Sequence, residues 1–376
     1  MGFPVVGVVG GGQLARMMAP AAIGLGVTLR VLARDPHDSA ALVVPQTTVG
    51  DEDDLDALRR FAAGCDVLTF DHEHVPTGHL RLLEREGIVV RPGSAALVHA
   101  QDKLVMRRRL TDLGAPCPRW AEVTSPADLE EFGAQVGWPL VLKRPRGGYD
   151  GKGVRLVNAP DGAEDWLADG PPLLAEERVG FTRELAVLVA RSPHGQAAVW
   201  PVVETVQVDG VCREVLAPAA IEGGHALAAQ QIALRIAEGL AVTGVMAVEM
   251  FDTPEGVRVN ELAMRPHNSG HWTIEGSRTS QFEQHLRAVL DLPLGNTSMT
   301  APRVAMANVL GGEVADMYAG YPHCFAHDPG LRIHMYGKVV RPGRKVGHVT
   351  ALGRDAQDVR DRARHAAAFL RGDIDG

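Results

Sequence analysis

The chain has 376 residues, of which 45% are apolar and 22% are charged. This length allows about two to four domains, and this composition can bury the core of an ordinary globular protein. The net charge of −8 argues against a general nucleic-acid or membrane surface, so an anionic ligand needs a local basic cluster. The sequence shows neither a secretory signal nor an apolar stretch long enough to span a bilayer, which predicts a cytoplasmic protein. Its four cysteines form no CxxC pair, and we expect them to be reduced.

Residues 1–100 alternate short apolar runs with helical patterns. The predicted strands are 5–9, 27–33, 67–70 and 88–90, and the first predicted helix is 13–23. This alternation predicts a parallel sheet with crossover helices.

From residue 139 the pattern changes to short strands and glycine turns, which predicts antiparallel hairpins. The predicted strands are 139–143, 173–178, 185–190 and 197–203. They are followed by a helix at 225–239, a hairpin at 247–262 and a smaller mixed segment from about 302 that ends in a helix at 355–371.

A glycine turn joins the first strand to the first helix. Residues 10–15, GGGQLA, fit G-x-G-x-x-A, and Asp35 follows about twenty residues later. Backbone amides near Gly12 and Gln13 could then meet an anion at the start of the helix. Taken alone, the pattern suggests a dinucleotide site, and the alternative is a tight turn without a ligand.

A glycine-rich segment follows the strand that ends at Lys143. Four glycines and several basic side chains lie within residues 144–153. Such a segment suits a flap that wraps phosphate oxygens with backbone amides, while Lys143 supplies a point charge. It lacks the G-K-S/T of a Walker loop, and a flexible hairpin loop is the alternative.

The hairpin at 247–262 carries two glutamates. If its turn centres on Pro254, Glu249 lies opposite Val259, and Glu261 points to the same face two residues further on. We therefore expect the two carboxylates to meet diagonally and to share Mg²⁺, which prefers hard oxygen ligands. The alternative is an exposed acidic hairpin.

Residues 265–273, RPHNSGHWT, are dense in polar groups and predict a catalytic loop. Arg265 could hold an anionic intermediate, His267 could bind or move a proton, and Asn268 could ligate metal or phosphate. A zinc site at His267 and His271 and a purely structural loop are the alternatives.

Four cations lie within residues 338–345 of this acidic protein. The cluster could receive a phosphate monoester, and a solvated turn between strands is the alternative.

Five stretches together closely resemble one family, the 5-(carboxyamino)imidazole ribonucleotide synthetases of the ATP-grasp superfamily. They are GGGQLARM from Gly10, KRPRGGYDGKG from Lys143, NELAMRPHNSGHWT from Asn260, SQFEQHLRAVLDLPLG from Ser280 and YGKVVRPGRKVGHV from Tyr336. The likeness covers nearly the whole chain. It implies an α/β and α+β protein with a parallel N-terminal domain at 1–100, a central ATP-grasp fold of two β-rich lobes at 101–298 and a small C-terminal domain at 299–376.

The resemblance also implies ligands and residue roles. It implies ATP contacts at Lys103, Lys143, Gly148, Tyr149, Asp150, Gly151, Lys152, Gly153, Val154, Glu176, Glu177, Arg178, Val179, Glu184, Gln207, Asn260 and Glu261, with 176–179 at the adenine and Glu184 at the ribose. It implies that Gly12, Gln13, Asp35, Glu73, Lys338, Arg344 and Lys345 contact aminoimidazole ribonucleotide. One or two Mg²⁺ ions are implied at Glu249, Glu261 and Asn268, and Arg265, His267 and Asp150 are implied as catalytic residues.

The implied reaction is carboxylation of that nucleotide by bicarbonate and ATP in purine biosynthesis, through carboxyphosphate, by a homodimer. Asp71-His72-Glu73-His74, Gln207 and Met264 depart from the usual family pattern, which affects substrate contacts more than the chemistry. Three other hypotheses remain at this stage. They are an ATP-grasp ligase for formate or an amino acid, a nicotinamide-dependent oxidoreductase built on the glycine turn, and a non-catalytic nucleotide-binding module.

Overall fold

The computed structural model describes residues 2–148, 151–168, 170 and 172–374. Its N-terminal sheet is parallel in the order β3-β2-β1-β4. The strands are β1 (Val5–Val9), β2 (Thr28–Ala33), β3 (Thr47–Val49) and β4 (Val67–Phe70). Near-continuous apolar runs such as β4 are buried on both faces, as crossover helices require. The strand expected at 88–90 is reduced to a single bridge between Leu68 and Val90.

Two antiparallel sheets form the rest of the framework. The smaller has the order β5-β8-β6-β7, with β5 (Trp120–Val123), β6 (Leu140–Lys143), β7 (Val154–Val157) and β8 (Leu173–Glu177). The larger has the order β14-β13-β9-β11-β12-β15-β17-β16. Its strands are β9 (Arg183–Arg191), β11 (Val203–Val208), β12 (Val211–Ala217), β13 (Gly244–Thr253), β14 (Gly256–Ala263), β15 (Arg303–Leu310), β16 (Arg332–Met335) and β17 (Lys345–Gly353), and β10 (Ala197–Val199) pairs with β9.

One expected strand, 197–203, is wrong as a single element. It is divided into β10 and the start of β11, because Trp200 is fully buried between them and Pro201 has no amide hydrogen for a ladder.

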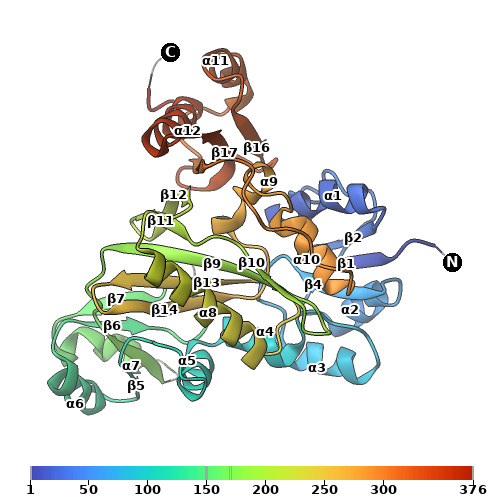
Figure 1. The fold of residues 1–376 in the computed structure, drawn as a ribbon. Coiled ribbons are helices and arrows are strands. Elements are labelled where there is room, and N and C mark those ends of the chain that lie inside the picture. The colour runs from blue at the N-terminus through green and yellow to red at the C-terminus, as the bar shows by residue number, and fades with distance from the viewer. Residues whose placement is uncertain (1, 149–150, 169, 171, 375–376) are drawn as a thin grey trace.

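The helices include the three predicted at 13–23, 225–239 and 355–371, which are α1, α8 and α12. In chain order the helices are α1 (Gln13–Leu25), α2 (Leu55–Ala62), α3 (Thr77–Arg85), α4 (Ser94–Gln101), α5 (Lys103–Asp112), α6 (Pro126–Val136), α7 (Glu164–Ala168), α8 (Gly223–Gly239), α9 (Thr273–Gly276), α10 (Gln281–Val289), α11 (Tyr321–His327) and α12 (Ala356–Arg371), with 3-10 turns at Pro160–Ala163, Asn268–Gly270 and Met317–Gly320. Figure 1 shows the N-terminal helices around the parallel sheet, and α12 with the C-terminal strands at the opposite end from α6. Within the described ranges no helix is long and apolar enough to cross a membrane.

The C-terminal strands continue the central sheet. Strand β15 pairs with β12 from Glu214 opposite Ala307 to Ala217 opposite Val304, and with β17 on its other side. Backbone ladders therefore fix the C-terminal segment against the lobe that carries β9 and β13.

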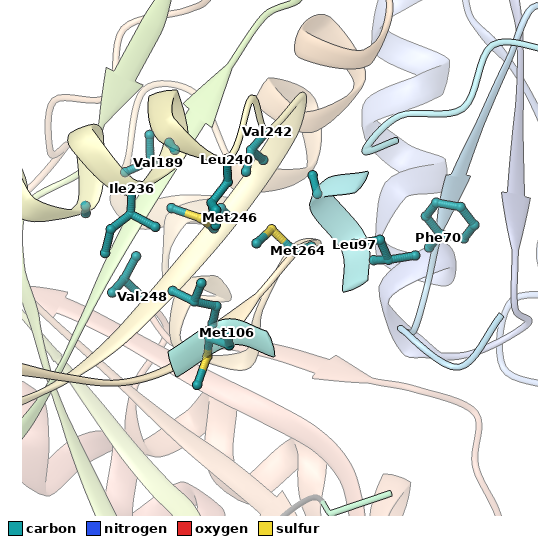
Figure 2. Close-up of a cluster of buried hydrophobic side chains, with 14 of the residues drawn as sticks. Phe70, Leu97, Met106, Val189, Ile236, Leu240, Val242, Met246, Val248 and Met264 are labelled. Atoms are coloured by element: carbon teal, nitrogen blue, oxygen red, sulfur yellow. The ribbon is translucent and has the colours of Figure 1, made fainter. Parts of the chain in front are cut away.

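A shared core joins the N-terminal domain to the central lobe. Figure 2 shows Phe70 and Leu97 on one side of this cluster and Met246 and Ile236 on the other, with Met264 between them. Each of these side chains is almost completely buried, and each such burial contributes roughly 1.5–3 kcal/mol. The domains that border the candidate site are thus held together by apolar packing.

A buried histidine adds a polar link between these domains. His285 on α10 is fully buried, its Nδ1 accepts from the Val245 N–H at 3.0 Å, and its Nε2 lies 2.7 Å from Thr69 Oγ1. Since Nδ1 accepts, Nε2 carries the proton and donates to Thr69. The ring thereby ties β13 to β4. Gly244 makes room for it, because a Cβ there would lie 2.9 Å from His285 Cε1 and the backbone φ is +112°.

This link predicts acid sensitivity. Burial lowers the pKa of His285 to about 3, whereas an unfolded histidine titrates near pH 6.5. The stabilisation is full above about pH 6.5 and is lost as the pH falls, because the unfolded chain then binds a proton that the folded chain excludes. We expect His285 to contribute a slope of about 1.4 kcal/mol per pH unit below that point.

Urea unfolding between about pH 7.5 and pH 5 measures this slope. His285→Gln keeps one donor and one acceptor without the titration, so its stability should depend less on pH than that of the parent. The exposed His37 gives a matched control in His37→Gln, which should follow the parent. Equal slopes for His285→Gln and the parent would contradict the assignment.

Candidate functional site

Two cavities meet in the middle of the molecule. The N-terminal cavity has a volume of about 1090 Å³ and lies between the glycine turn, residues 71–77 and the loop before β17. The interlobe cavity has a volume of about 1100 Å³ and is lined by both antiparallel sheets. Five residues line both cavities, and we call them the junction residues: Glu249, Glu261, His267, Asn268 and Lys345.

Most residues singled out in the sequence line one of these cavities. Besides the junction residues, the N-terminal cavity is lined by Gly12, Gln13, Glu73, Lys103, Gly148, Lys152, Arg265, Lys338 and Arg344. The interlobe cavity is lined by Lys143, Gly151, Val154, Glu176, Glu177, Arg178, Val179, Glu184, Gln207 and Asn260. Asp35 and Gly153 line neither cavity, and Tyr149 and Asp150 lie outside the described residues. Residues from all three parts of the chain therefore converge on one site.

The hairpin register differs from the expected one. Glu249 pairs directly with Glu261, and Met250 pairs with Val259, so Asn260 is an extra residue in β14. The predicted diagonal arrangement, with Glu249 opposite Val259, is therefore wrong. This bulge brings the two carboxylates directly opposite each other, and it places Asn260 where its side-chain oxygen accepts a hydrogen bond from Lys143 at 2.8 Å.

Each junction carboxylate lies close to the side-chain nitrogen of a lysine or a histidine. Lys103 Nζ lies 2.8 Å from Glu261 Oε1, and His267 Nε2 lies 3.1 Å from Glu249 Oε1. Burial by itself raises the pKa of Glu249, but the hydrogen bond and charge of His267 bring it below the ordinary value. Both glutamates keep about a third of their side-chain surface exposed, so they remain open to a ligand.

Glu184 lies beside this pair on β9. Burial raises the pKa of Glu184 to about 7, and the nearby charge of Glu249 raises it further than Lys143 lowers it. Near neutral pH this carboxyl group is therefore protonated in part of the molecules. The protonated form can donate a hydrogen bond in the interlobe cavity, and the ionised form only accepts.

A network of buried charges borders the interlobe cavity. Arg107 and Glu176 are almost completely buried and form an ion pair, and Lys143 Nζ lies 2.8 Å from the other oxygen of Glu176. Burial alone raises the pKa of Glu176, but Lys143 and Arg107 lower it to about 2. Arg107 also donates to the Asn260 carbonyl at 2.6 Å. The carboxylate of Glu176 is thus committed to two cations, and Lys143 is held in place at the cavity.

The loop at 265–271 is fixed by a residue that the sequence analysis did not single out. The fully buried Gln281 accepts from the His267 N–H at 2.8 Å and donates to the His267 carbonyl at 2.8 Å. Asn308 on β15 exchanges two hydrogen bonds with the Asn268 side chain, at 2.9 and 2.8 Å. The available signal for Gln281 was its place directly after Ser280, at the start of a helical segment that belongs to a stretch carrying the family resemblance.

Two pairs of predicted residues contact each other across the N-terminal cavity. Arg265 Nε lies 2.8 Å from Glu73 Oε2, and Lys338 Nζ donates to Gln13 Oε1. These contacts join loop 265–271 and the C-terminal basic cluster to the N-terminal domain. His271, proposed as a zinc ligand with His267, is instead fully buried and accepts from Gln281 at 3.0 Å. No group of three or more His, Cys, Asp or Glu residues in the described ranges could hold a metal ion.

Family models match three consecutive parts of the chain. Residues 3–101 match the ribonucleotide synthetase preATP-grasp domain, residues 108–282 match the ATP-grasp domain, and residues 304–362 match the phosphoribosylaminoimidazole carboxylase C-terminal domain. The chain is therefore an ATP-grasp ligase in fold and class, which replaces the oxidoreductase hypothesis.

Relatives give the particular family. The chain is 55% identical to the N5-carboxyaminoimidazole ribonucleotide synthase of Mycobacterium tuberculosis, over 98% of this chain and 88% of that protein. The structure of the synthetase from Thermus thermophilus is 40% identical with a TM-score of 0.88, and 99% of each chain is covered. The Aspergillus clavatus synthase solved with ADP and 5-aminoimidazole ribonucleotide is 33% identical with a TM-score of 0.89, again over 99% of each chain. The chain belongs to the N5-carboxyaminoimidazole ribonucleotide synthase family.

The buried network gives a prediction for the site. Arg107→Met leaves Glu176 with Lys143 alone and frees the Asn260 carbonyl, so we expect the free energy of unfolding to fall by about 3 kcal/mol or more. The Michaelis constant for ATP should also rise, because Lys143 loses its fixed position.

The neighbouring Arg108 provides the matched control. It pairs with Glu122 at the surface and is 52% exposed, so Arg108→Met should stay within about 1 kcal/mol of the parent. Urea unfolding and ATP titration of both variants measure the difference. Equal effects of the two substitutions would contradict a special role for the buried guanidinium.

Proposed function

We propose that this protein uses ATP and bicarbonate to carboxylate the exocyclic amine of 5-aminoimidazole ribonucleotide in purine biosynthesis. The observation that carries the proposal is the meeting of the two cavities at the junction residues, Glu249, Glu261, His267, Asn268 and Lys345. One ligand can enter from each side, and their reacting ends meet where acidic, basic and amide groups converge. The family membership supports the same chemistry.

ATP is proposed to occupy the interlobe cavity. Residues 176–179 line this cavity and would contact the adenine, while Glu184 would contact the ribose. Lys143, held by Glu176, points a positive charge at the phosphates, and Lys103 reaches them from beside Glu261. The glycine flap would close over the phosphates, since Gly148, Gly151 and Val154 border the cavities.

Magnesium is proposed at Glu249 and Glu261, with Asn268 as a third oxygen donor. The donor set suits this ion, because two carboxylates face each other across the ladder and both are open to the junction. Asn268 Oδ1 accepts from Asn308 and has a second lone pair for a cation. One or two ions would neutralise phosphate charge when ATP is bound.

The ribonucleotide is proposed to occupy the N-terminal cavity. Lys338, Arg344 and Lys345 would receive its phosphate, and Gln13 and Glu73 would contact the rest of the molecule. Asp35 lies away from this cavity, so its proposed contact would need a movement of its loop.

The reaction begins at the junction. A bicarbonate oxygen attacks the γ-phosphorus of ATP, the bond to the bridging oxygen breaks, and ADP and carboxyphosphate form. The carbon–oxygen bond of carboxyphosphate then breaks to give carbon dioxide and inorganic phosphate. The amine attacks carbon dioxide and loses a proton, which leaves the carboxylated nucleotide. Closure of the site protects the short-lived intermediate from water.

Arg265 and His267 are proposed to handle that intermediate. Arg265 borders the cavity while paired with Glu73, so its remaining N–H groups can hold an anion. His267 faces Glu249 through Nε2 and can exchange a proton there. Asp150 is proposed as a third catalytic residue on the flap. We further propose a cytoplasmic homodimer.

The proposal predicts coupled turnover. ADP release from the purified protein with Mg-ATP should be slow, and it should rise when bicarbonate and aminoimidazole ribonucleotide are added together. Omission of Mg²⁺ should abolish the increase. ADP release that is indifferent to both substrates, or that depends on formate or an amino acid instead, would contradict the proposal.

A further inference from the structure

His271, Tyr336 and His348 form a cluster of buried rings next to the site, and the proposed chemistry does not use them. His271 comes from the stretch HNSGHW and His348 from RPGRKVGH, two stretches that carry the family resemblance. Both imidazoles are fully buried, and their ring centroids lie 5.0 Å apart at an interplanar angle of 31°. Burial lowers the pKa of His271 and of His348 well below the usual range, so both rings are neutral and contact each other as packed surfaces.

One end of this cluster holds the base of the basic loop, residues 337–345. Tyr336 precedes the loop and His348 follows it, and the Tyr336 hydroxyl lies 2.8 Å from His348 Nδ1. Tyr336 is fully buried, and its N–H donates to the Val346 carbonyl at 2.9 Å. Gly337 and Gly343 have positive φ angles, +67° and +75°. These two glycines allow the tight turns of the loop, and Tyr336 and His348 fix its base.

The other end holds the candidate catalytic loop. Gln281 Nε2 donates to His271 Nδ1 at 3.0 Å and also to the His267 carbonyl at 2.8 Å. Gln281 Oε1 accepts from the His267 N–H at 2.8 Å. Gln281 therefore connects the His271 ring to His267, which lies 3.1 Å from Glu249 at the junction. A shift of the His271 ring would displace His267 through this one side chain.

A continuous path thus runs from the basic loop to the junction. It comprises Tyr336, His348, His271, Gln281 and His267, and every side chain before His267 is fully buried. Buried polar groups cost free energy unless they are hydrogen-bonded, and apolar residues of the same size could fill this space without that cost. The benefit of the polar side chains is geometric, because hydrogen bonds fix the orientation of a ring and apolar packing would not.

We propose that Tyr336, His348, His271 and Gln281 are positioning residues that couple occupancy of the basic loop by the nucleotide phosphate to the placement of His267. The proposal rests on the function proposed above. Its consequence is that ATP cleavage accelerates only when the acceptor nucleotide is bound, which avoids loss of the short-lived carboxyphosphate to water. Coupling of this kind needs a physical connection between the two sites, and these packed side chains connect them.

The test compares ADP release with and without aminoimidazole ribonucleotide, always with Mg-ATP and bicarbonate. Tyr336→Phe removes only the hydroxyl that bonds to His348. We expect the acceptor-dependent stimulation to fall about three- to tenfold, as expected for one buried hydrogen bond, while ADP release without acceptor stays at the parental rate. More ADP should also form per carboxylated product, because cleavage and transfer are less well matched.

Thr350→Val provides the matched control. Thr350 is fully buried on β17, two residues beyond His348, and its hydroxyl has no hydrogen-bond partner among the described residues. This variant should keep the parental stimulation. His271→Asn should resemble Tyr336→Phe, and the double variant should lose less than the product of the two single effects, because both act on one path.

The outcomes separate this proposal from the proposed function. Parental stimulation with parental product yield in Tyr336→Phe would overturn the coupling. An equal fall of ADP release with and without acceptor, accompanied by a lower melting temperature, would also overturn it, since that pattern is a purely structural effect. Absence of stimulation in the parent protein itself would overturn the proposed function and the coupling with it.

Discussion

The buried guanidinium of Arg107 sets the geometry on which the nucleotide side of the site depends. A buried positive charge is costly unless it is paired, and Glu176 forms ion pairs with both Arg107 and Lys143. Because Arg107 also binds the Asn260 carbonyl, one side chain from α5 connects a strand of the smaller sheet to the bulged hairpin of the larger one. One buried side chain thus bonds to both lobes, and the Arg107, Lys143 and Glu176 group carries one net positive charge beside the cavity between them.

The larger sheet extends this order to the N-terminal cavity. Its strands pair side by side from the glutamate-bearing hairpin to β17 and β16, and the basic loop connects β16 to β17. His285 and the shared apolar core fix the N-terminal domain against the same lobe. The junction residues therefore come from distant parts of the chain but lie on a single framework.

The sequence predicted many of the strands and the helices α1, α8 and α12, and the family resemblance predicted the fold class and the family, which the comparisons confirm. The Glu249–Glu261 register was missed because a bulge at Asn260 has no local signal in an alternating strand. The pairing of β12 with β15 joins residues far apart in the chain, which periodicity cannot reveal. Gln281, His285 and Asn308 escaped notice because a polar residue on a helix or strand suggests an exposed face. Only tertiary packing shows that these three are buried and hydrogen-bonded.

We have proposed that bicarbonate is activated by phosphoryl transfer at the junction of the two cavities. Turnover with bicarbonate labelled by oxygen-18 tests it most directly, because the attacking oxygen remains on phosphorus when carboxyphosphate breaks down. The account predicts that each turnover places one labelled oxygen in inorganic phosphate and that label appears only when ATP is cleaved. Inorganic phosphate free of label, together with normal formation of carboxylated nucleotide, would contradict it.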